Sequence, residues 1–155
     1  MSAPEIATCL WFDNQGLEAA QVYVSLFDDS EITAVFYKGG DAANSVLTVE
    51  FTLRGQRYWI LNGGPLFTHS PAASISVHVD TQAEVDRRWG GLLTGGGVES
   101  RCGWLVDRFG LSWQIIPRAL PRLLKSDSTG RVMAAMMSMV KLDIAALDAA
   151  AGGAI

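Results

Sequence analysis

The chain has little cysteine: Cys9 and Cys102 are the two cysteines among its 155 residues. They lie far apart and do not form the closely spaced pair that is typical of a zinc site. The simplest interpretation is two reduced thiols, which suits a cytoplasmic protein. A disulfide-based scaffold is therefore not expected.

Clustered basic charge and long apolar runs are also missing. The net charge is −4, and no stretch concentrates lysine or arginine, so nucleic-acid binding is not expected. The longest apolar runs, such as Trp59–Leu61, are too short to cross a bilayer, so no membrane partner is expected. Met1–Glu5 shows no basic region followed by an apolar segment, so we expect no signal peptide and a cytoplasmic location.

The chain does have many apolar residues, 49%, which is enough for a sizeable core. Its length suits one domain, or two small modules that share a sheet. In the first half, a helix is predicted from the spacing of its apolar residues, with Asp13 or Asn14 as its N-cap. Around this helix we predict four strands: Ala7–Phe12, Ile32–Tyr37, Ser45–Leu53 and Gln56–Leu61. Lys38–Asn44 is expected to be a loop.

The same order returns after the Gly- and Pro-rich segment Asn62–Pro71. A strand over Ser74–Val79 precedes a helix that ends at Gly95–Gly97, and a hairpin joins Gly103–Val106 to Leu111–Ile116. Residues also correspond: the 13–15 segment aligns with 80–82, Gly55 with Gly110 and Tyr58 with Trp113. Chance similarity of two helix-capping segments is the alternative.

We therefore predict an α+β fold of two βαβββ modules, residues 5–63 and 72–117, whose mixed sheet surrounds a cleft within a domain of residues 1–117. Residues 118–155 form a predicted helical extension. Asp127, Ser128 or Thr129 can cap a methionine-rich helix that runs to Val140, and a second helix covers Leu142–Ala150. Helices this short must pack on the domain or on a partner.

Two segments resemble a known family. These are Asn62–Phe67 and, more specifically, Cys102–Pro117; both are similar to the PhnB-like family, which also carries the label 3-demethylubiquinone-9 3-methyltransferase domain. The tail segment Arg131–Ala145 also resembles the ending of that family's sequences. That family is part of the glyoxalase/bleomycin-resistance/dioxygenase, or vicinal-oxygen-chelate, superfamily. The resemblance implies paired βαβββ modules and a homodimer.

The methyltransferase label meets a physical objection. A Rossmann-type methyltransferase needs a Gly-rich turn directly after a parallel strand. Gly95–Gly97 follows a predicted helix, so we interpret it as a helix end and expect no cofactor there.

Strand alternation indicates which side chains line the cleft. Within Ser74–Val79 the polar residues share one face, and Ser112 and Gln114 share a face of the last strand. Aromatic contacts with the ligand are expected from Phe12, Trp59 and Trp104. The predicted ligand-binding set is Thr8, Leu10, Phe12, Trp59, Ser74, Ser76, His78, Trp104, Ser112 and Gln114. A solvated sheet face is the alternative.

Metal-dependent members of the superfamily place one His or Glu ligand on each of four strands. The resemblance assigns those positions to Thr8, Trp59, Ser74 and Gln114, and none of these is a His or a carboxylate. We therefore predict no metal and no cofactor.

Few residues remain for chemistry. His78 is a weak candidate for a general base and Cys102 for a nucleophile. Asp107 is interpreted as a turn residue and Glu50 as a paired charge.

The predicted function is binding of a small apolar or aromatic molecule without a metal. The alternatives are an enzyme of the superfamily, a methyltransferase, or an interaction module that exchanges its methionine-rich helix between subunits.

Overall fold

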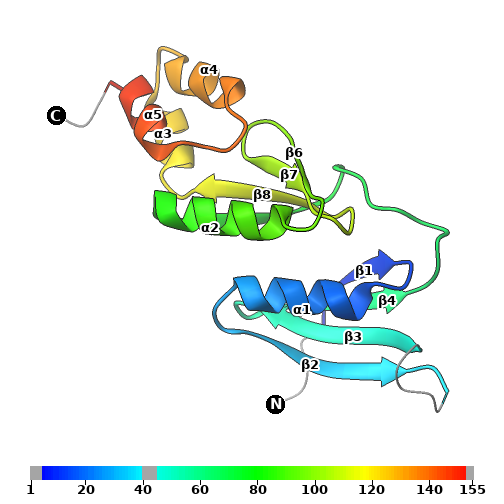
Figure 1. Ribbon diagram of the computed structural model, residues 1–155. Helices are drawn as coiled ribbons and strands as arrows, with labels where there is room; N and C mark the ends of the chain where they lie inside the picture. Colours follow the sequence, from blue (N-terminus) through cyan, green and yellow to red (C-terminus); the bar gives the residue numbers. More distant parts are fainter. Residues whose placement is uncertain (1–4, 40–44, 153–155) are drawn as a thin grey trace. The chain divides into compact units, whose positions relative to one another are not determined.

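The computed structural model describes residues 5–39 and 45–152, so residues 40–44 of the expected loop lie outside it. The chain divides into two compact units, Met1–His69 and Ser70–Ile155 (Figure 1). Unit 1 contains β1 (Thr8–Phe12), α1 (Gly16–Leu26), β2 (Ser30–Tyr37), β3 (Val46–Leu53) and β4 (Gln56–Asn62). Unit 2 contains β5 (Ser74–Val79), α2 (Gln82–Leu93), β6 (Val98–Glu99), β7 (Trp104–Val106) and β8 (Ser112–Pro117). Three helices follow: α3 (Leu120–Ser126), α4 (Arg131–Ser138) and α5 (Ile144–Ala150).

The prediction of two βαβββ modules in an α+β fold is confirmed. The sheet orders are β1-β4-β3-β2 and β5-β8-β7-β6, and in each sheet the first strand runs parallel to the last strand of its own unit. The other pairings are antiparallel. Among the described residues, no helix is long and apolar enough to cross a membrane.

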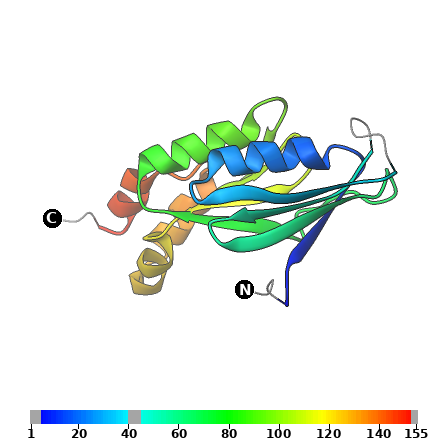
Figure 2. The same ribbon diagram turned by 90° about the horizontal axis from the view of Figure 1, so that it is seen from below.

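In unit 1, helix α1 covers one face of the sheet (Figures 1 and 2). Its small residues Ala19 and Ala20 are fully buried, which lets the helix approach the strands closely. The ring of Tyr23 lies 6.3 Å, centroid to centroid, from the ring of Phe51 on β3. The core of unit 1 therefore lies between α1 and this face of β4 and β3.

The start of α1 is capped from a distant part of the chain. The prediction that Asp13 or Asn14 caps this helix is wrong: the N-cap residue is Gln15, and its side chain makes no capping hydrogen bond. Instead, Asn62 Oδ1 accepts a hydrogen bond from Gly16 N at 2.9 Å, and Asn62 Nδ2 donates to the carbonyl of Val46. One side chain at the end of β4 thus fixes both α1 and the start of β3.

Helix α2 of unit 2 begins with a local capping box. The Thr81 hydroxyl accepts from Glu84 N, and Glu84 Oε2 accepts from Thr81 N at 3.0 Å. Beneath α2, Trp89 and Leu92 are buried with Trp113 of β8. Gly96 N and Gly97 N both donate to the carbonyl of Leu93, which confirms that this glycine run ends a helix.

The last three helices belong to unit 2 and form a separate apolar cluster. Leu123, Val132, Leu142 and Leu147 are buried in it. The prediction that Asp127, Ser128 or Thr129 is the N-cap of α4 is wrong, because Gly130 occupies that position and makes no side-chain cap. Asp127 still contributes to the first turn, since its Oδ2 accepts a hydrogen bond from Val132 N at 2.8 Å. Of the methionines, Met136 and Met139 pack against the cluster, whereas Met133 and Met137 are exposed.

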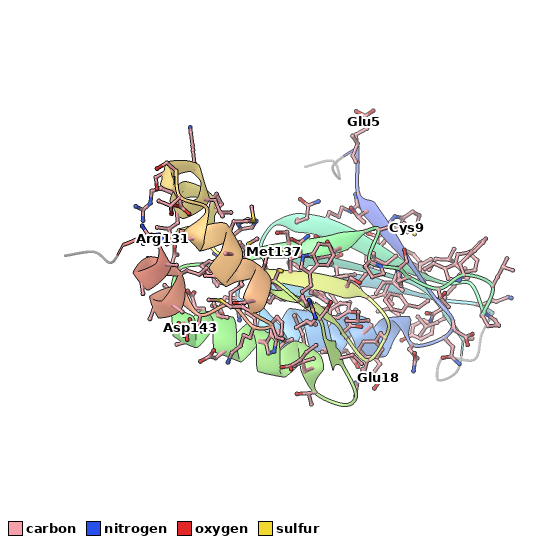
Figure 3. The ribbon with its side chains drawn as sticks, turned by 90° about the horizontal axis from the view of Figure 1, so that it is seen from above. Glu5, Cys9, Glu18, Arg131, Met137 and Asp143 are labelled. Carbon is pink, nitrogen blue, oxygen red and sulfur yellow. The ribbon has the colours of Figure 1, made fainter. Side chains whose placement is uncertain are left out.

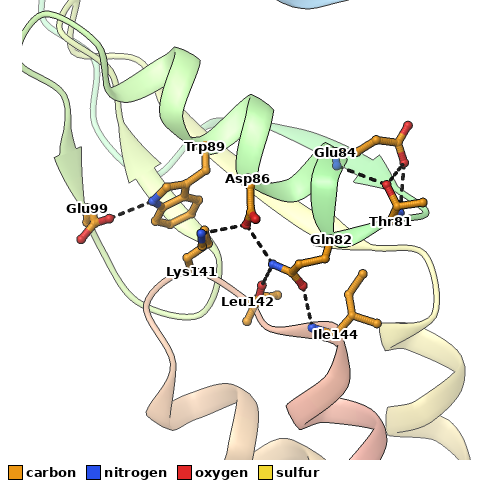
Figure 4. Close-up of polar contacts among 9 residues, drawn as sticks. All are labelled: Thr81, Gln82, Glu84, Asp86, Trp89, Glu99, Lys141, Leu142 and Ile144. Atoms are coloured by element: carbon orange, nitrogen blue, oxygen red, sulfur yellow. Dashed lines mark hydrogen bonds and ion pairs between the residues drawn. The ribbon is translucent and has the colours of Figure 1, made fainter.

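Residues 139–144, here called the strap, run from the end of α4 to the first residue of α5 and tie this cluster to the sheet and to α2. Cys102 N donates to the carbonyl of Met139, and Gly103 N donates to the carbonyl of Val140. Farther along, Gln82 donates to the carbonyl of Leu142 and accepts from Ile144 N (Figure 4). Lys141 Nζ lies 2.7 Å from Asp86 Oδ1. The strap thus joins the β6–β7 loop to the first turn of α2.

Candidate functional site

Each sheet has one face turned away from the helix α1 or α2 of its own unit, and we call it the distal face. In unit 1, β1 is paired residue by residue with β4, Cys9 beside Trp59 and Leu10 beside Ile60. Ile60 is fully buried and contacts Gly16 of α1, so Leu10 lies on the α1 side and Cys9 on the distal side. Figure 3 shows Cys9 on the side of the unit 1 sheet opposite α1.

The prediction that Leu10 and Phe12 face a ligand is therefore wrong in orientation. Leu10 is 7% exposed and Phe12 is 3% exposed, and both share their face with the core. Strand β1 carries large apolar residues on both faces, so the alternation of its side chains does not identify which face is buried. The distal face of β1 is formed by Cys9 and Trp11.

A shallow hollow of about 260 Å³ lies on unit 1 around Trp59. It is lined by Glu5, Ala7, Glu50, Arg57 and Trp59. Trp59 is 41% exposed, and beside it Arg57 Nη2 lies 3.1 Å from Glu50 Oε2, which confirms the prediction that Glu50 is a paired charge. Burial raises the pKa of the neighbouring Cys9 thiol, so this thiol stays protonated to higher pH.

The first family segment, Asn62–Phe67, encloses Trp11. The indole Nε1 donates to the carbonyl of Gly64 at 2.9 Å, and the ring of Phe67 meets the indole edge-on with centroids 5.0 Å apart. A Cβ atom on Gly63 would lie 2.3 Å from the indole ring, so only glycine leaves room for it. This part of the motif therefore has a packing role.

On unit 2, the distal face is polar. Ser74, Ser76 and His78 lie on one face of β5, and strand pairing places Ser112 and Gln114 of β8 on the same face. Trp104 of β7 is paired with Gln114 and shares that face. The predicted grouping of these residues on one face agrees with the pairing; that they bind a ligand stays a prediction.

Two side-chain contacts organise this polar face. Gln114 Nε2 donates to Ser74 Oγ at 2.8 Å, and Ser76 Oγ lies 3.0 Å from His78 Nε2. Ser76 and His78 are exposed, whereas Ser74 and Gln114 are half-buried. Ser112 is 0% exposed, so a ligand could touch its hydroxyl only if neighbouring atoms moved.

The four positions assigned to metal ligands do not form a suitable donor set. Thr8 lies on the α1 side of its sheet and Trp59 on the distal side, so these two side chains cannot bind the same ion. The residue of the first strand region that lines the hollow with Trp59 is Ala7. Ser74 and Gln114 supply a neutral hydroxyl and a neutral amide, which repay little of the dehydration of a divalent cation. Within residues 5–39 and 45–152, no three His, Cys, Asp or Glu side chains gather as a metal site.

Asp107 and Cys102, two further residues that the sequence singled out, have defined neighbours in the structure. Asp107 is a turn residue, as predicted: its carboxylate accepts from Phe109 N, Leu111 N and Trp113 Nε1 at 2.8 to 3.0 Å. Cys102 has a positive φ of 58°, and its Sγ lies 3.6 Å from Met137 Sδ. A nucleophilic role for Cys102 stays a prediction.

Sequence reasoning missed Glu5, Ala7, Cys9, Trp11 and Arg57. The only available signal was the alignment of the two halves, in which 13–15 corresponds to 80–82. The same offset places Ala7 opposite Ser74 and Cys9 opposite Ser76. Applied to the first strand, that offset would have selected the distal face correctly.

Solved structures and a family profile agree with this architecture. The PhnB protein from Bacillus cereus is 31% identical, with a TM-score of 0.67, and the match covers 74% of this chain and 99% of that one. A Pseudomonas aeruginosa protein is 20% identical, with a TM-score of 0.59, over 74% of this chain and 98% of the other. A mutant of the fosfomycin resistance protein FosX from Listeria monocytogenes, complexed with Mn(II) and a dihydroxypropylphosphonic acid, is 15% identical, with a TM-score of 0.56, over 80% and 99%.

These similarities define a glyoxalase-fold protein of the vicinal-oxygen-chelate superfamily. The profile of the 3-demethylubiquinone-9 3-methyltransferase family matches residues 4–116, and the chain belongs to that PhnB-like family. The match ends before α3, so helices α3, α4 and α5, and with them the tail segment Arg131–Ala145 that resembles the family's ending, lie outside the matched region. A comparison with curated protein sequences finds no match.

Proposed function

We propose that the chain binds a small apolar or aromatic molecule on the distal faces of its sheets, without a resident metal. The observation that carries this proposal is Trp59, a large aromatic side chain left 41% exposed over a hollow. Exposing an indole to water in a well-packed unit costs hydrophobic free energy, which a ligand ring placed against it would recover. The neutral donor set described above supports binding without a metal.

A fluorescent aromatic probe tests the proposal. We expect 1-aminonaphthalene to bind saturably with increased emission, and Trp59→Ala to weaken that binding about tenfold because the ring contact is lost. Tyr37→Ala is the matched control, since Tyr37 is 46% exposed but lies on β2, at the far edge of the sheet from β1. Equal affinity in wild type and Trp59→Ala would contradict the proposal.

The family name makes methyl transfer the second candidate function. Against it, Gly95–Gly97 closes a helix, and the loops that lead from β1 into α1 and from β5 into α2 contain no glycine before the helix begins. Calorimetry with S-adenosylmethionine should therefore show no binding. Micromolar affinity would favour the methyltransferase instead.

A further inference from the structure

The position that the superfamily uses for a metal holds, in unit 2, a hydroxyl and an amide that are bonded to each other. We propose that the Ser74–Gln114 pair binds a neutral carbonyl oxygen of the ligand directly, where metal-dependent relatives would place their ion. This inference rests on the proposed function, because it identifies the polar group that an aromatic ligand carries.

The Ser74–Gln114 pair carries more hydrogen-bond donors than its mutual contact uses. The Gln114 amide has two N–H groups and the Ser74 hydroxyl has one O–H, which gives three donors in all. Their mutual contact of 2.8 Å uses one N–H of Gln114, which donates to the Ser74 hydroxyl oxygen. Within the described residues, no other hydrogen bond engages the two side chains, so two adjacent donors remain.

Two adjacent donors match the two lone pairs of one carbonyl oxygen. Oxyanion holes use paired donors in the same way, to stabilise negative charge on one oxygen. Both side chains are half-buried, so these bonds would form partly away from water, where they are stronger than at an exposed site.

The surroundings favour a neutral ligand that carries an aromatic ring. Strand pairing places Ser76 and Trp104 beside Gln114, and neither carries a charge; the titratable group on this face of β5 is His78. A carboxylate would lose hydration without gaining a permanent cation. Trp104 offers an indole to a ring attached to the carbonyl carbon.

The cluster of the last three helices bounds one end of this face. Ile116 follows Gln114 on the same face of β8, and it packs against the cluster that contains Val132 and Leu142. An apolar group on the ligand would therefore find Ile116 at that end. The carbonyl would lie over the Ser74–Gln114 pair.

Acetophenone and ethylbenzene form the probe pair, because they differ mainly by the carbonyl oxygen. By calorimetry on the full chain, we expect acetophenone to bind about tenfold more tightly than ethylbenzene, with benzoate weaker than acetophenone. Added Mn(II) should change none of these affinities. The carbonyl stretching band of bound ¹³C-labelled acetophenone should lie at the low frequency typical of a doubly hydrogen-bonded carbonyl.

Two variants of Gln114 assign the effect to this pair. Gln114→Met keeps the size but removes both N–H groups, so it should weaken acetophenone about tenfold and leave ethylbenzene unchanged. Gln114→Glu should reject acetophenone and favour benzyl alcohol, whose O–H can donate to a carboxylate. Gln56→Met, on the exposed hairpin of unit 1, is the matched control and should change neither affinity.

The outcomes separate this inference from the proposed function. If acetophenone and ethylbenzene bind equally, or if Gln114→Met weakens both equally, ring binding stands and the oxygen site is wrong. If neither compound binds to the wild type, both proposals are wrong. A gain of acetophenone affinity on adding Mn(II) would overturn the direct carbonyl contact.

Discussion

The two units build the same frame and place different chemistry on it. Their sheets have the same strand order, and the corresponding residues Tyr58 and Trp113 are buried at equivalent places in the two cores. The distal faces differ: Trp59 in unit 1 corresponds to Gln114 in unit 2, counted from the hairpin glycines Gly55 and Gly110. Packing against the helix thus requires apolar residues on one face of each sheet. The distal face can carry either apolar or polar side chains.

The helix starts differ in the same pair of units. In unit 1 the cap of α1 is Asn62, 46 residues away along the chain, whereas in unit 2 the cap of α2 is Thr81 with Glu84 three residues on. Unit 1 therefore acquires its cap only when β4 is in place, and unit 2 has its cap encoded locally. Substitutions in both units, and then changes of pH, test the comparison of the two units in order of decreasing expected effect.

The largest effect is expected from Gly63→Ala in unit 1. A Cβ atom there would lie 2.3 Å from the Trp11 ring, so the indole must move and would strain its hydrogen bond to Gly64. We expect a loss of about 2–3 kcal/mol in the free energy of unfolding, measured by urea denaturation.

Gly90→Ala in α2 is the matched control for that substitution. No atom lies within 4 Å of a Cβ added at Gly90, so a helix interior should gain about 0.5–1 kcal/mol from alanine. If Gly63→Ala is as stable as the wild type, the enclosure of Trp11 does not contribute to the stability of unit 1.

A smaller difference is expected between the two caps. Asn62→Ala removes the acceptor for Gly16 N and the donor to Val46, and should cost about 2 kcal/mol. Thr81→Ala removes one local acceptor and should cost about 1 kcal/mol. Asn62→Asp keeps the acceptor, so it should lose less stability than Asn62→Ala. Urea denaturation of the three variants measures their free energies of unfolding. Equal losses in Asn62→Ala and Thr81→Ala would contradict the expected difference between the two caps.

The smallest effects concern pH, and they have opposite signs in the two units. In unit 2, hydrogen bonds lower the pKa values of three carboxyl groups. The backbone N–H groups of Asp80 and Thr81 bind Glu84, and the side chains of Lys141 and Gln82 bind Asp86. Asp127 is bound by the side chain and backbone of Thr129 and by the backbone of Val132. In unit 1, burial raises the pKa values of Cys9 and Tyr58.

A lowered carboxyl pKa stabilises the fold above the ordinary carboxyl pKa of about 4, and this stabilisation is lost as the pH falls through the lower value in the folded state. A raised thiol or phenol pKa stabilises the fold at neutral pH, and this is lost as the pH rises through the raised value. Hydrogen exchange should therefore show acid loosening the three carboxylate sites of unit 2 first and alkali loosening β1 and β4 of unit 1 first. The reverse order would contradict the assignment.

The sequence predicted the fold well because its signals are local. Helical spacing and strand alternation depend on near neighbours, and the repeat between residues 13–15 and 80–82 compares two such local patterns. The polar face of β5 was identified because its serines alternate with Ile75 and Val77. Asp107 was recognised as a turn residue because its carboxylate accepts hydrogen bonds from backbone N–H groups of its own hairpin, those of Phe109 and Leu111.

The same local signals could not locate the candidate site on unit 1. Leu10 and Trp11 are both large and apolar, so strand alternation by itself does not show which of them is buried under α1, whereas the pairing with Ile60 and Leu61 does. The hollow around Trp59 depends on the Glu50–Arg57 ion pair across two strands. Contacts of this kind are set by tertiary structure and leave no periodic trace in the sequence.

The strap also has a consequence for the order in which the nascent chain can fold during translation. The amide of Gln82 finds its partners in Leu142 and Ile144, which are synthesised 60 and 62 residues later. The long-range hydrogen bonds described for unit 1 all join residues before position 70, so that unit can complete itself early on the ribosome. In unit 2 the hydrogen bonds of the Gln82 side chain to the strap can form only after residue 144 has emerged.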